Sequence, residues 1–399
     1  MNINTSSLSN AALILEDGNI FFGKQIGISG ETFGEIVFNT SMTGYQEIIT
    51  DPSYSNQIIT FTYPHIGNVG VNKNDCESNI VYANGIIIRD LSIVSSNYRS
   101  EGSLLTYLKK KKIIGISDID TRKLTKIIRI SGSQLGCIIA HKKIKISKTL
   151  QKLKQLSHSK KIDLVQIVST KTQYTLNNKN FKINNIPTIK NIKKKSKTRI
   201  VVYDFGVKQN ILKILINQKC HITVVPAQTS AKEAMKLLPN GIFLSNGPGD
   251  PRPCYYAINA IKSFLKINIP IFGICLGHQL LALANGAQIT KMRFGHHGGN
   301  HPVKELCSNK VMITSQNHNF TVNPIDLPKS IEITHISLFD KSIQGLRIKD
   351  KNAFSFQGHP ESSPGPHDAL SLFENFITLV KSCNYNIANK GEKCQNVPI

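Results

Sequence analysis

The sequence predicts an α/β protein with two domains: a mostly β (α+β) N-terminal domain, then a domain built on a doubly wound, mostly parallel sheet. Three observations lead to this expectation. The chain has 399 residues, more than one domain usually holds. Short β-branched runs broken by Gly, Asn, Asp and Pro fill its first third. From residue 199 onward, strands and helices alternate, which is typical of a parallel sheet covered on both faces.

The N-terminal domain is expected over residues 1–168. Its β-branched runs predict strands at 11–15, 20–23, 35–39, 57–63, 85–89 and 113–116. Helices are expected at 104–111 and after Asp118. Residues 169–198 are polar and rich in Asn and Lys, which predicts a linker between the domains.

The second domain is expected over residues 199–385, followed by a polar tail at 386–399. Its first part predicts strands at 200–204, 222–226, 242–245 and 269–272, with helices at 209–217, 230–238 and 255–265. Further strands are expected at 311–314, 331–335, 343–347 and 353–356, before a helix at 368–380. Because doubly wound sheets bind ligands beyond the carboxyl ends of their strands, a site is expected after Ser245 and Phe272.

The formal net charge of +24 raises nucleic acid as a partner. However, the lysines are scattered through every segment, and the runs at 109–112 and 193–195 contain no aromatic residue. Solvated surface lysines explain this pattern better than a nucleic-acid interface, so no nucleic-acid partner is expected.

The cysteine pattern and the hydropathy indicate a cytoplasmic protein. The eight cysteines include no CxxC pair and no closely spaced framework, which favours reduced thiols. The first ten residues lack a basic and then apolar signal region, and no apolar run reaches the roughly 18 residues that a membrane span needs. Neither export nor membrane insertion is expected.

The segment 273–279 contains the candidate nucleophile. Its sequence, GICLGHQ, joins an apolar strand to an apolar helix, with Cys275 at the junction. Flanking glycines suit the strained turn that exposes a nucleophile at a helix N-terminus. The helix dipole favours the thiolate there, and the N–H of Leu276 is suited to hold an oxyanion. An inert buried cysteine is the alternative for this motif taken alone.

A base and an orienting carboxylate follow another predicted strand. The sequence FQGHPE at 356–361 separates His359 and Glu361 by two residues, so both side chains project to one side of an extended segment. Glu361 then holds one imidazole nitrogen while the other faces the thiol, which predicts a triad with Cys275. The alternative, a surface histidine in a proline turn, explains neither Glu361 nor Gly358.

A turn after a neighbouring predicted strand supplies the third motif. SNGPGDP at 245–251 has glycines on both sides of Pro248, and the Gly247 N–H is a candidate second oxyanion donor. Together GICLGHQ, SNGPGDP and GHPE resemble the class I (triad) glutamine amidotransferases. That resemblance implies an amidotransferase domain that hydrolyses the side-chain amide of glutamine.

The first domain narrows the resemblance. FNTSMTGYQE (38–47), TDPSY (50–54), YPHIGN (63–68) and DIDTR (118–122) resemble the N-terminal domain peculiar to the small subunits of carbamoyl-phosphate synthetases. KMRFGHHGGNHP (291–302) and SQNH (315–318) in the second domain match the same family. The likeness therefore extends over about residues 11–382.

The resemblance implies the role of each site residue. Cys275 attacks the glutamine amide, and His359, oriented by Glu361, protonates the departing ammonia and then activates water. The backbone N–H groups of Gly247 and Leu276 hold the oxyanion. The residues matching those that bind glutamine in the family are Ser53, Gly249, Gln279, Asn317, Asn319 and Phe320. Ser53 belongs to the first domain, so both domains are expected to contribute to the site.

One position departs from the family pattern. Where the family reads Gln-Asn-His-Gly-Phe, this chain has Asn319 in place of the glycine. If the glycine serves a positive φ, asparagine is the ordinary residue best able to replace it. Glutamine binding is therefore expected to be retained, with a slightly altered loop energy.

Three other features suggest sites that we do not expect. GNIFFGKQ at 18–25 resembles a phosphate-binding loop but lacks Ser or Thr after Lys24, and it is better explained as a hairpin strand.

His296, His297 and His301 lie close in sequence, but the glycines at 298–299 suit a backbone-packed loop and no Cys or carboxylate completes a metal site. Cys254 is expected to be a packed thiol beside the Gly247 turn rather than a second nucleophile.

No cofactor is expected on this chain, because it has no convincing ATP site. The resemblance implies ATP and magnesium on a separate large synthetase subunit, which receives ammonia through a protected tunnel and serves arginine and pyrimidine synthesis. It also implies a higher-order oligomer of heterodimers. Two alternatives stay open: an amidotransferase subunit of another synthase, such as the anthranilate type, and a non-catalytic basic scaffold that binds nucleic acid.

Overall fold

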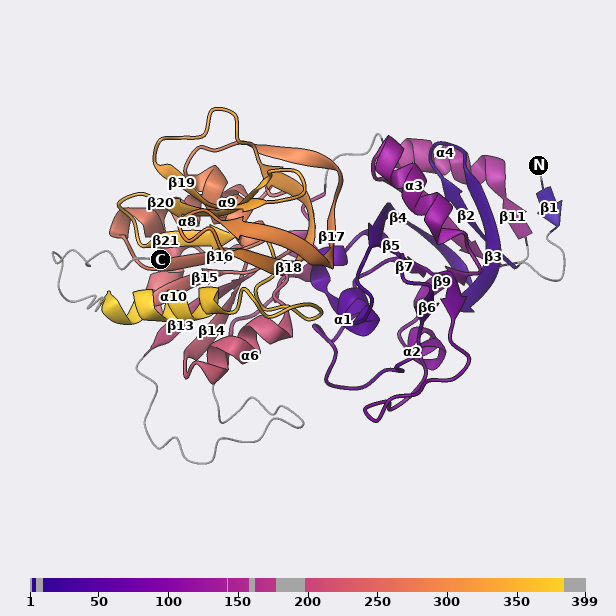
Figure 1. Ribbon diagram of the computed structural model, residues 1–399, viewed down its shortest axis with the longest axis horizontal. Helices are drawn as coiled ribbons and strands as arrows, with labels where there is room; N and C mark the ends of the chain where they lie inside the picture. Colours follow the sequence, from indigo (N-terminus) through magenta and orange to yellow (C-terminus); the bar gives the residue numbers. More distant parts are fainter. Residues whose placement is uncertain (1, 5–9, 142, 158–161, 177–197, 384–399) are drawn as a thin grey trace. The chain divides into compact units, whose positions relative to one another are not determined.

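The computed structural model describes residues 2–4, 10–141, 143–157, 162–176 and 198–383 (Figure 1). Most of the predicted linker and the whole predicted tail lie outside these residues. The chain divides into two units. The N-terminal unit comprises Met1–Ile162, Met292–Gly299 and Ser363–Gly365, and the C-terminal unit comprises Asp163–Lys291, Asn300–Ser362 and Pro366–Ile399. The domain boundaries at 168 and 199 stay predictions.

The N-terminal unit is built on a closed barrel with the strand order β10-β2-β3-β9-β7-β5-β4. In chain order these strands are β2 (Ala11–Leu15), β3 (Ile20–Gly27), β4 (Gly30–Asn39), β5 (Gln57–Phe61), β7 (Gly85–Ile87), β9 (Ile114–Ser117) and β10 (Gln134–Ala140). Strands β2 and β3 pair in an antiparallel hairpin, which confirms that Lys24 lies on a strand and not in a phosphate-binding loop. The predicted mostly β character of this region is also confirmed.

Short helices and strands surround the barrel. They are α1 (Tyr45–Thr50), η1 (Pro52–Tyr54), α2 (Leu104–Lys110), α3 (Thr121–Ser131), α4 (Ile146–Ser157), β1 (Asn2–Asn4), β6 (His65–Ile66), β8 (Asp90–Leu91) and β11 (Lys143–Lys145). Ser103 and Asp120 cap α2 and α3 by accepting bonds from backbone N–H groups, as expected for helix starts. Leu124 and Ile128 of α3 join a buried cluster with Leu13 of the barrel.

The C-terminal unit contains a ten-stranded sheet in the order β12-β14-β13-β15-β16-β21-β20-β19-β17-β18. The strands are β12 (Tyr174–Leu176), β13 (Arg199–Asp204), β14 (His221–Pro226), β15 (Gly241–Leu244), β16 (Ile271–Ile274), β17 (Ile289–Glu305), β18 (Val311–Val322), β19 (Ile331–Ser337), β20 (Ile343–Ile348) and β21 (Ala353–Phe356). Strands β14, β13, β15, β16 and β21 are parallel neighbours, and β20 and β19 extend the sheet in antiparallel pairings. The predicted fold class is confirmed, with an antiparallel extension.

Helices cover both faces of this sheet (Figure 1). They are α5 (Val165–Val168), α6 (Gln209–Asn217), α7 (Ala231–Lys236), α8 (Tyr255–Ile267), α9 (Leu276–Ala284) and α10 (Ser371–Ser382). Val201 packs in one buried cluster with residues of α8 and α9, whereas its neighbour Val202 packs in another with residues of α6 and α10. Alternate side chains of a strand point to opposite faces, so the sheet is buried on both sides.

The structure corrects one predicted loop. The glycines at 298–299 lie within strand β17 and not in a backbone-packed loop. His296 and His297 on this strand belong to the N-terminal unit, whereas His301 belongs to the C-terminal unit. Among the described residues, no helix has the length and apolar character needed to cross a membrane.

Candidate active site

Cys275 lies at a strained turn between strand β16 and helix α9. Its backbone has φ 52° and ψ −102°, which non-glycine residues rarely adopt. Its N–H donates to the carbonyl of Phe356 on β21 at 2.9 Å, and its carbonyl accepts the N–H of Gln279 at 3.1 Å. The strand and the helix therefore hold the strained residue from both sides, as in a nucleophile elbow.

Glycines allow this turn to pack closely against the neighbouring strand. A Cβ on Gly277 would lie 2.3 Å from the carbonyl oxygen of Leu244, and one on Gly273 would lie 2.7 Å from that of Gly277. The N–H of Gly277 donates to the carbonyl of Ser245 at 3.1 Å, which ties α9 to the end of β15. A side chain at either glycine would push the helix away from the sheet.

The two oxyanion candidates, Gly247 and Leu276, lie against each other. A Cβ on Gly247 would be 2.8 Å from Cδ2 of Leu276 and 2.2 Å from the carbonyl oxygen of Phe205. Leu276 is the first residue of α9, where a backbone N–H has no intrahelical acceptor. Two backbone donors near Cys275 are the arrangement that stabilises a tetrahedral oxyanion.

His359 and Glu361 are completely buried beside Cys275. Nδ1 of His359 and Oε1 of Glu361 lie 2.6 Å apart, and the backbone N–H of His359 donates to the carbonyl of Ser315 at 2.8 Å. Nε2 of His359 is buried, and the Cys275 side chain is among the groups that raise the pKa of His359. The structure therefore brings together the three predicted triad residues.

Charge within this cluster outweighs the cost of burial. Burial lowers the pKa of His359, but Glu361 and Cys275 oppose it and raise the pKa to about 10. Burial raises the pKa of Glu361, but Lys208 and His359 reverse that effect and hold the pKa at about 2. The cluster therefore keeps an ionised carboxylate and a protonated imidazole at neutral pH.

Lys208 is a member of this buried cluster that the sequence reasoning missed. Its Nζ lies 3.0 Å from Oε1 of Glu361 and also donates to the carbonyl of Ser362, and the residue is only 2% exposed. Lys208 occupies the N-cap position of α6, in the loop that follows strand β13. Ligands bind beyond the carboxyl ends of parallel strands, and this rule predicted a site after Ser245 and Phe272. The same rule applies to the loop that contains Lys208.

Strand β18, which is bonded to His359 through Ser315, also approaches the nucleophile. Sγ of Cys275 lies 3.5 Å from the carbonyl oxygen of Asn317. Nε2 of Gln279 donates to the carbonyl of Phe320 at 2.9 Å and to Oε1 of Gln357 at 3.1 Å. The predicted residues Gln279, Asn317 and Phe320 are thus close to one another and to Cys275.

Several buried polar atoms near these residues have no partner among the described residues. They are Oε1 of Gln279, Oε1 of Gln316 and Nε2 of Gln357. A buried polar atom without a hydrogen bond is costly, so these atoms are candidates to contact a polar ligand. Gln316 and Gln357 were not among the predicted binding residues.

Comparison with known proteins agrees with this geometry. A family model described as "Glutamine amidotransferase class-I" matches residues 201–379, and one described as "Carbamoyl-phosphate synthase small chain, CPSase domain" matches residues 13–138. Proteins named "Carbamoyl phosphate synthase small chain" align over nearly the whole chain. That from Buchnera aphidicola subsp. Baizongia pistaciae is 64% identical over 96% of this chain and 96% of its own length. That from Pectobacterium atrosepticum is 57% identical over 94% of this chain and 98% of its own length.

The chain belongs to the carbamoyl phosphate synthase small chain family. Its C-terminal unit carries the class I amidotransferase match, and its N-terminal unit carries the match specific to the small chain. An anthranilate-type synthase subunit is therefore not favoured.

The expectation for Asn319 was conditional on a positive φ at this position, and the structure does not meet that condition. Asn319 lies in strand β18, and its φ is not among the positive values. An extended backbone is open to any residue, so asparagine needs no special conformational tolerance here. A positive φ therefore gives no reason for an altered loop energy at Asn319, and retained glutamine binding stays a prediction.

Two further predicted contacts lie outside the strands and α-helices. Gly249 has φ +83°, a conformation that favours glycine, and a Cβ there would lie 3.2 Å from Cδ1 of Leu164. Ser53 belongs to the N-terminal unit, in η1, and its N–H donates to Oδ1 of Asp51 at 2.9 Å. The contribution of Ser53 to glutamine binding stays a prediction.

Cys254 differs from Cys275 in its surroundings. It is fully buried, and its Sγ lies 3.8 Å from Oδ1 of Asp163. Burial and then the Asp163 charge raise the pKa of Cys254 to about 12, so this thiol stays protonated at neutral pH. This environment is that of a packed thiol.

Proposed function

We propose that the chain is the glutaminase subunit of a carbamoyl phosphate synthase, with Cys275 as its nucleophile. One observation carries this proposal: Cys275 occupies a strained elbow at a helix N-terminus, beside the buried His359–Glu361 pair. A core cysteine needs neither the strained backbone nor a buried imidazole–carboxylate pair. The match of the chain to small chains over nearly its full length supports the same conclusion.

In the first step, the sulfur of Cys275 attacks the side-chain carbonyl carbon of L-glutamine. A C–S bond forms, and the carbonyl oxygen becomes an oxyanion held by the N–H groups of Gly247 and Leu276. The protonated His359 and the helix N-terminus both stabilise negative charge on the attacking sulfur. When the C–N bond breaks, Nε2 of His359 gives its proton to the nitrogen, and ammonia leaves a γ-glutamyl thioester.

In the second step, His359 accepts a proton from water as the water oxygen attacks the thioester carbon. The C–S bond breaks, and glutamate and the Cys275 thiolate are released. Glu361 orients the imidazole and stabilises its charged form in both steps, in the manner of a triad carboxylate. Lys208 is a positioning residue, because it acts on the substrate only through Glu361.

Glutamine recognition is assigned to groups around the elbow. Oε1 of Gln279 is a buried acceptor without a partner among the described residues, and the α-ammonium group of glutamine is a matching donor. Further contacts are proposed for Ser53, Gly249, Asn317, Asn319 and Phe320, which match glutamine-binding residues of the family. The α-carbon end of the substrate, which carries both of its ionised groups, would then be held while the neutral side-chain amide faces Cys275.

The ammonia is proposed to pass to a large synthase chain. The phosphorylation chemistry, with ATP and magnesium, belongs to that partner, and the carbamoyl phosphate formed serves arginine and pyrimidine synthesis. Higher-order assembly of such heterodimers and a cytoplasmic location complete the proposal. The thinly spread cysteines, free among the described residues, are consistent with a reducing compartment.

The test is glutamate release by the full chain, with and without a large chain, for the wild type and Cys275→Ser. We expect release that rises with the partner and disappears in the variant. Activity that the substitution leaves unchanged would overturn the mechanism. Polynucleotide binding with steep salt dependence, in place of any glutaminase activity, would favour the basic scaffold.

A further inference from the structure

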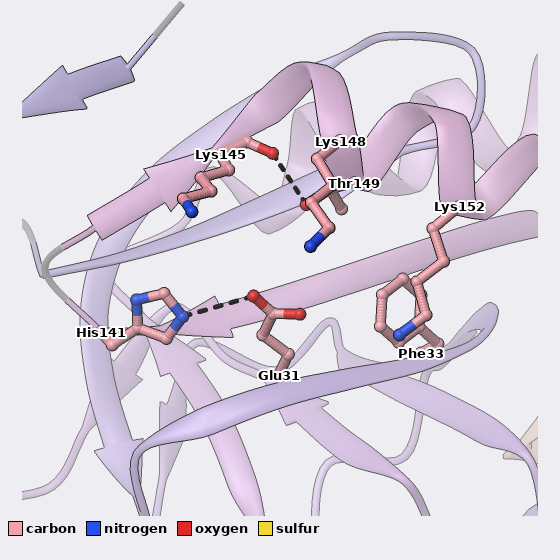
Figure 2. Close-up of a pocket in the computed structure, with 7 residues that line it drawn as sticks. All are labelled: Glu31, Phe33, His141, Lys145, Lys148, Thr149 and Lys152. Atoms are coloured by element: carbon pink, nitrogen blue, oxygen red, sulfur yellow. Dashed lines mark hydrogen bonds and ion pairs between the residues drawn. The ribbon is translucent and has the colours of Figure 1, made fainter.

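The N-terminal unit contains a cavity of about 540 Å³ that is separate from the residues around Cys275. It lies between helix α4 and strands β4 and β10 (Figure 2). The lining residues are Glu31, Phe33, His141, Lys145, Lys148, Thr149 and Lys152. This volume lies within the range typical of small-molecule sites.

One wall of the cavity carries three lysines. Lys148 and Lys152 are four residues apart on one face of α4, and Lys145, the last residue of β11 (Lys143–Lys145), lines the same cavity. Among the described residues, none of the three forms an ion pair with a carboxylate. Like charges this close repel one another, so the wall holds positive charge that no ion pair among the described residues offsets.

The opposite wall compensates this charge only in part. Oε1 of Glu31 lies 3.4 Å from Nε2 of His141, so the acidic residue of the lining already has a partner (Figure 2). Three lysines against one glutamate leave the lining with a net charge of +2 when His141 is neutral.

Two contacts give the lysine wall a defined form. Nζ of Lys152 lies 4.1 Å from the ring centroid of Phe33, a cation–π distance that restrains this ammonium group over the ring (Figure 2). The hydroxyl of Thr149, which is 4% exposed, donates to the carbonyl of Lys145 at 3.1 Å and ties the start of α4 to the preceding strand. Lys152 and the start of α4 are therefore partly ordered before a ligand binds, which lowers the conformational-entropy cost of binding.

We propose that this cavity binds a small phosphate-bearing anion. Lysine ammonium groups are donors only, and a phosphate offers several acceptor oxygens and enough charge to neutralise neighbouring lysines. Inorganic diphosphate is the smallest ligand with two adjacent phosphates, and a nucleotide is the larger source of the same group. A polynucleotide fits less well, because Lys152 already covers a face of the Phe33 ring that base stacking needs.

The test is isothermal titration of the full chain with inorganic diphosphate, comparing wild type with a Lys148→Gln/Lys152→Gln variant. The control, Lys109→Gln/Lys110→Gln, removes the same charge from exposed positions of α2. We expect saturable single-site binding that weakens at least about tenfold in the cavity variant and less than about twofold in the control. Thermal unfolding of both variants checks that each remains folded.

Parallel titrations with orthophosphate, ATP and a polynucleotide identify the source of the phosphate. ATP binding tighter than diphosphate indicates a nucleotide, whereas equal affinities indicate that the phosphate groups alone are recognised. An equal loss in both variants would reduce the effect to general attraction by a chain of net charge +24 and overturn the proposal. Absence of saturation, or binding of polynucleotide alone, would overturn it as well.

Discussion

At the residue scale, the chemistry depends on a carboxylate that is completely buried. Glu361 is 0% exposed, and a buried carboxylate is costly unless cations and hydrogen bonds compensate it. Lys208 and His359 both contact its Oε1, and Asn210 donates to its backbone carbonyl. The cluster fixes the imidazole in one orientation, which a triad base requires.

Removing this carboxylate is expected to affect both stability and rate. In Glu361→Gln the buried Lys208 loses its counter-charge, so we expect about 3–5 kcal/mol less free energy of unfolding. We also expect a fall in kcat of at least about a hundredfold, because the imidazole loses its orienting charge. Urea unfolding and glutamate release measure the two effects. Glu374→Gln, on an exposed position of α10, should change neither, and equal behaviour of the two variants would contradict the role of Glu361.

Lys208 sets the pH range over which the carboxylate is ionised. Its charge helps to hold the pKa of Glu361 at about 2, below the usual value of 4.5, so the resulting stabilisation is present above pH 4.5 and is lost as pH falls toward 2. In Lys208→Met, the loss of stability in acid should begin at a higher pH than in the wild type. The acid limb of the kcat/KM profile should move in the same direction. Lys208→Arg should restore much of the wild-type profile. Identical profiles for wild type and Lys208→Met would refute this role.

At the element scale, the turn from β16 to α9 determines where the nucleophile lies. In Gly277→Ala the new Cβ would meet the carbonyl oxygen of Leu244 at 2.3 Å, so the helix must shift. We expect a loss of about 1–3 kcal/mol in stability and a large fall in kcat. Gly102→Ala is the matched control, because its Cβ would have no neighbour nearer than 4.0 Å. Full activity in Gly277→Ala would show that the elbow tolerates displacement.

Asn319 provides a second test at this scale. Because it lies in β18 without a positive φ, Asn319→Gly should lower stability by about 0.5–1 kcal/mol through backbone entropy. Its KM for glutamine should stay within a few-fold of the wild type. Steady-state kinetics and urea unfolding check both statements. A large gain in glutamine affinity would mean that the asparagine impairs the site.

The local sequence pattern predicted most helices and strands, but it did not predict features that depend on contacts between residues far apart in the sequence. Helix α6 and strand β21 have the expected bounds, because each coincides with a clear apolar run. Strand β17 was missed, since its glycines and histidines lack β-branched character and its pairing with β19 is set by the tertiary fold. Lys208 was missed for a similar reason, because its partner Glu361 lies 153 residues further along the chain, a separation no local pattern reveals.

At the scale of the whole molecule, the three catalytic candidates and Lys208 all lie in the C-terminal unit. Three short motifs were enough to predict the triad, because the carboxyl ends of adjacent parallel strands meet at one edge of a sheet. The supporting amides of Gln316 and Gln357 could not be predicted, since no chemistry of their own distinguishes them from other glutamines. Three of the lysines that give the chain its high positive charge line the cavity beside α4.

The most direct test of the central claim is to trap the covalent intermediate. Full chain with a large chain would be mixed with isotopically labelled glutamine, quenched in acid and digested, and the labelled peptide identified by mass spectrometry. The account predicts label on the peptide containing Cys275, released by hydroxylamine as expected for a thioester, and no label in Cys275→Ser. Label on another residue, or glutamate release by the Cys275→Ser variant, would contradict it.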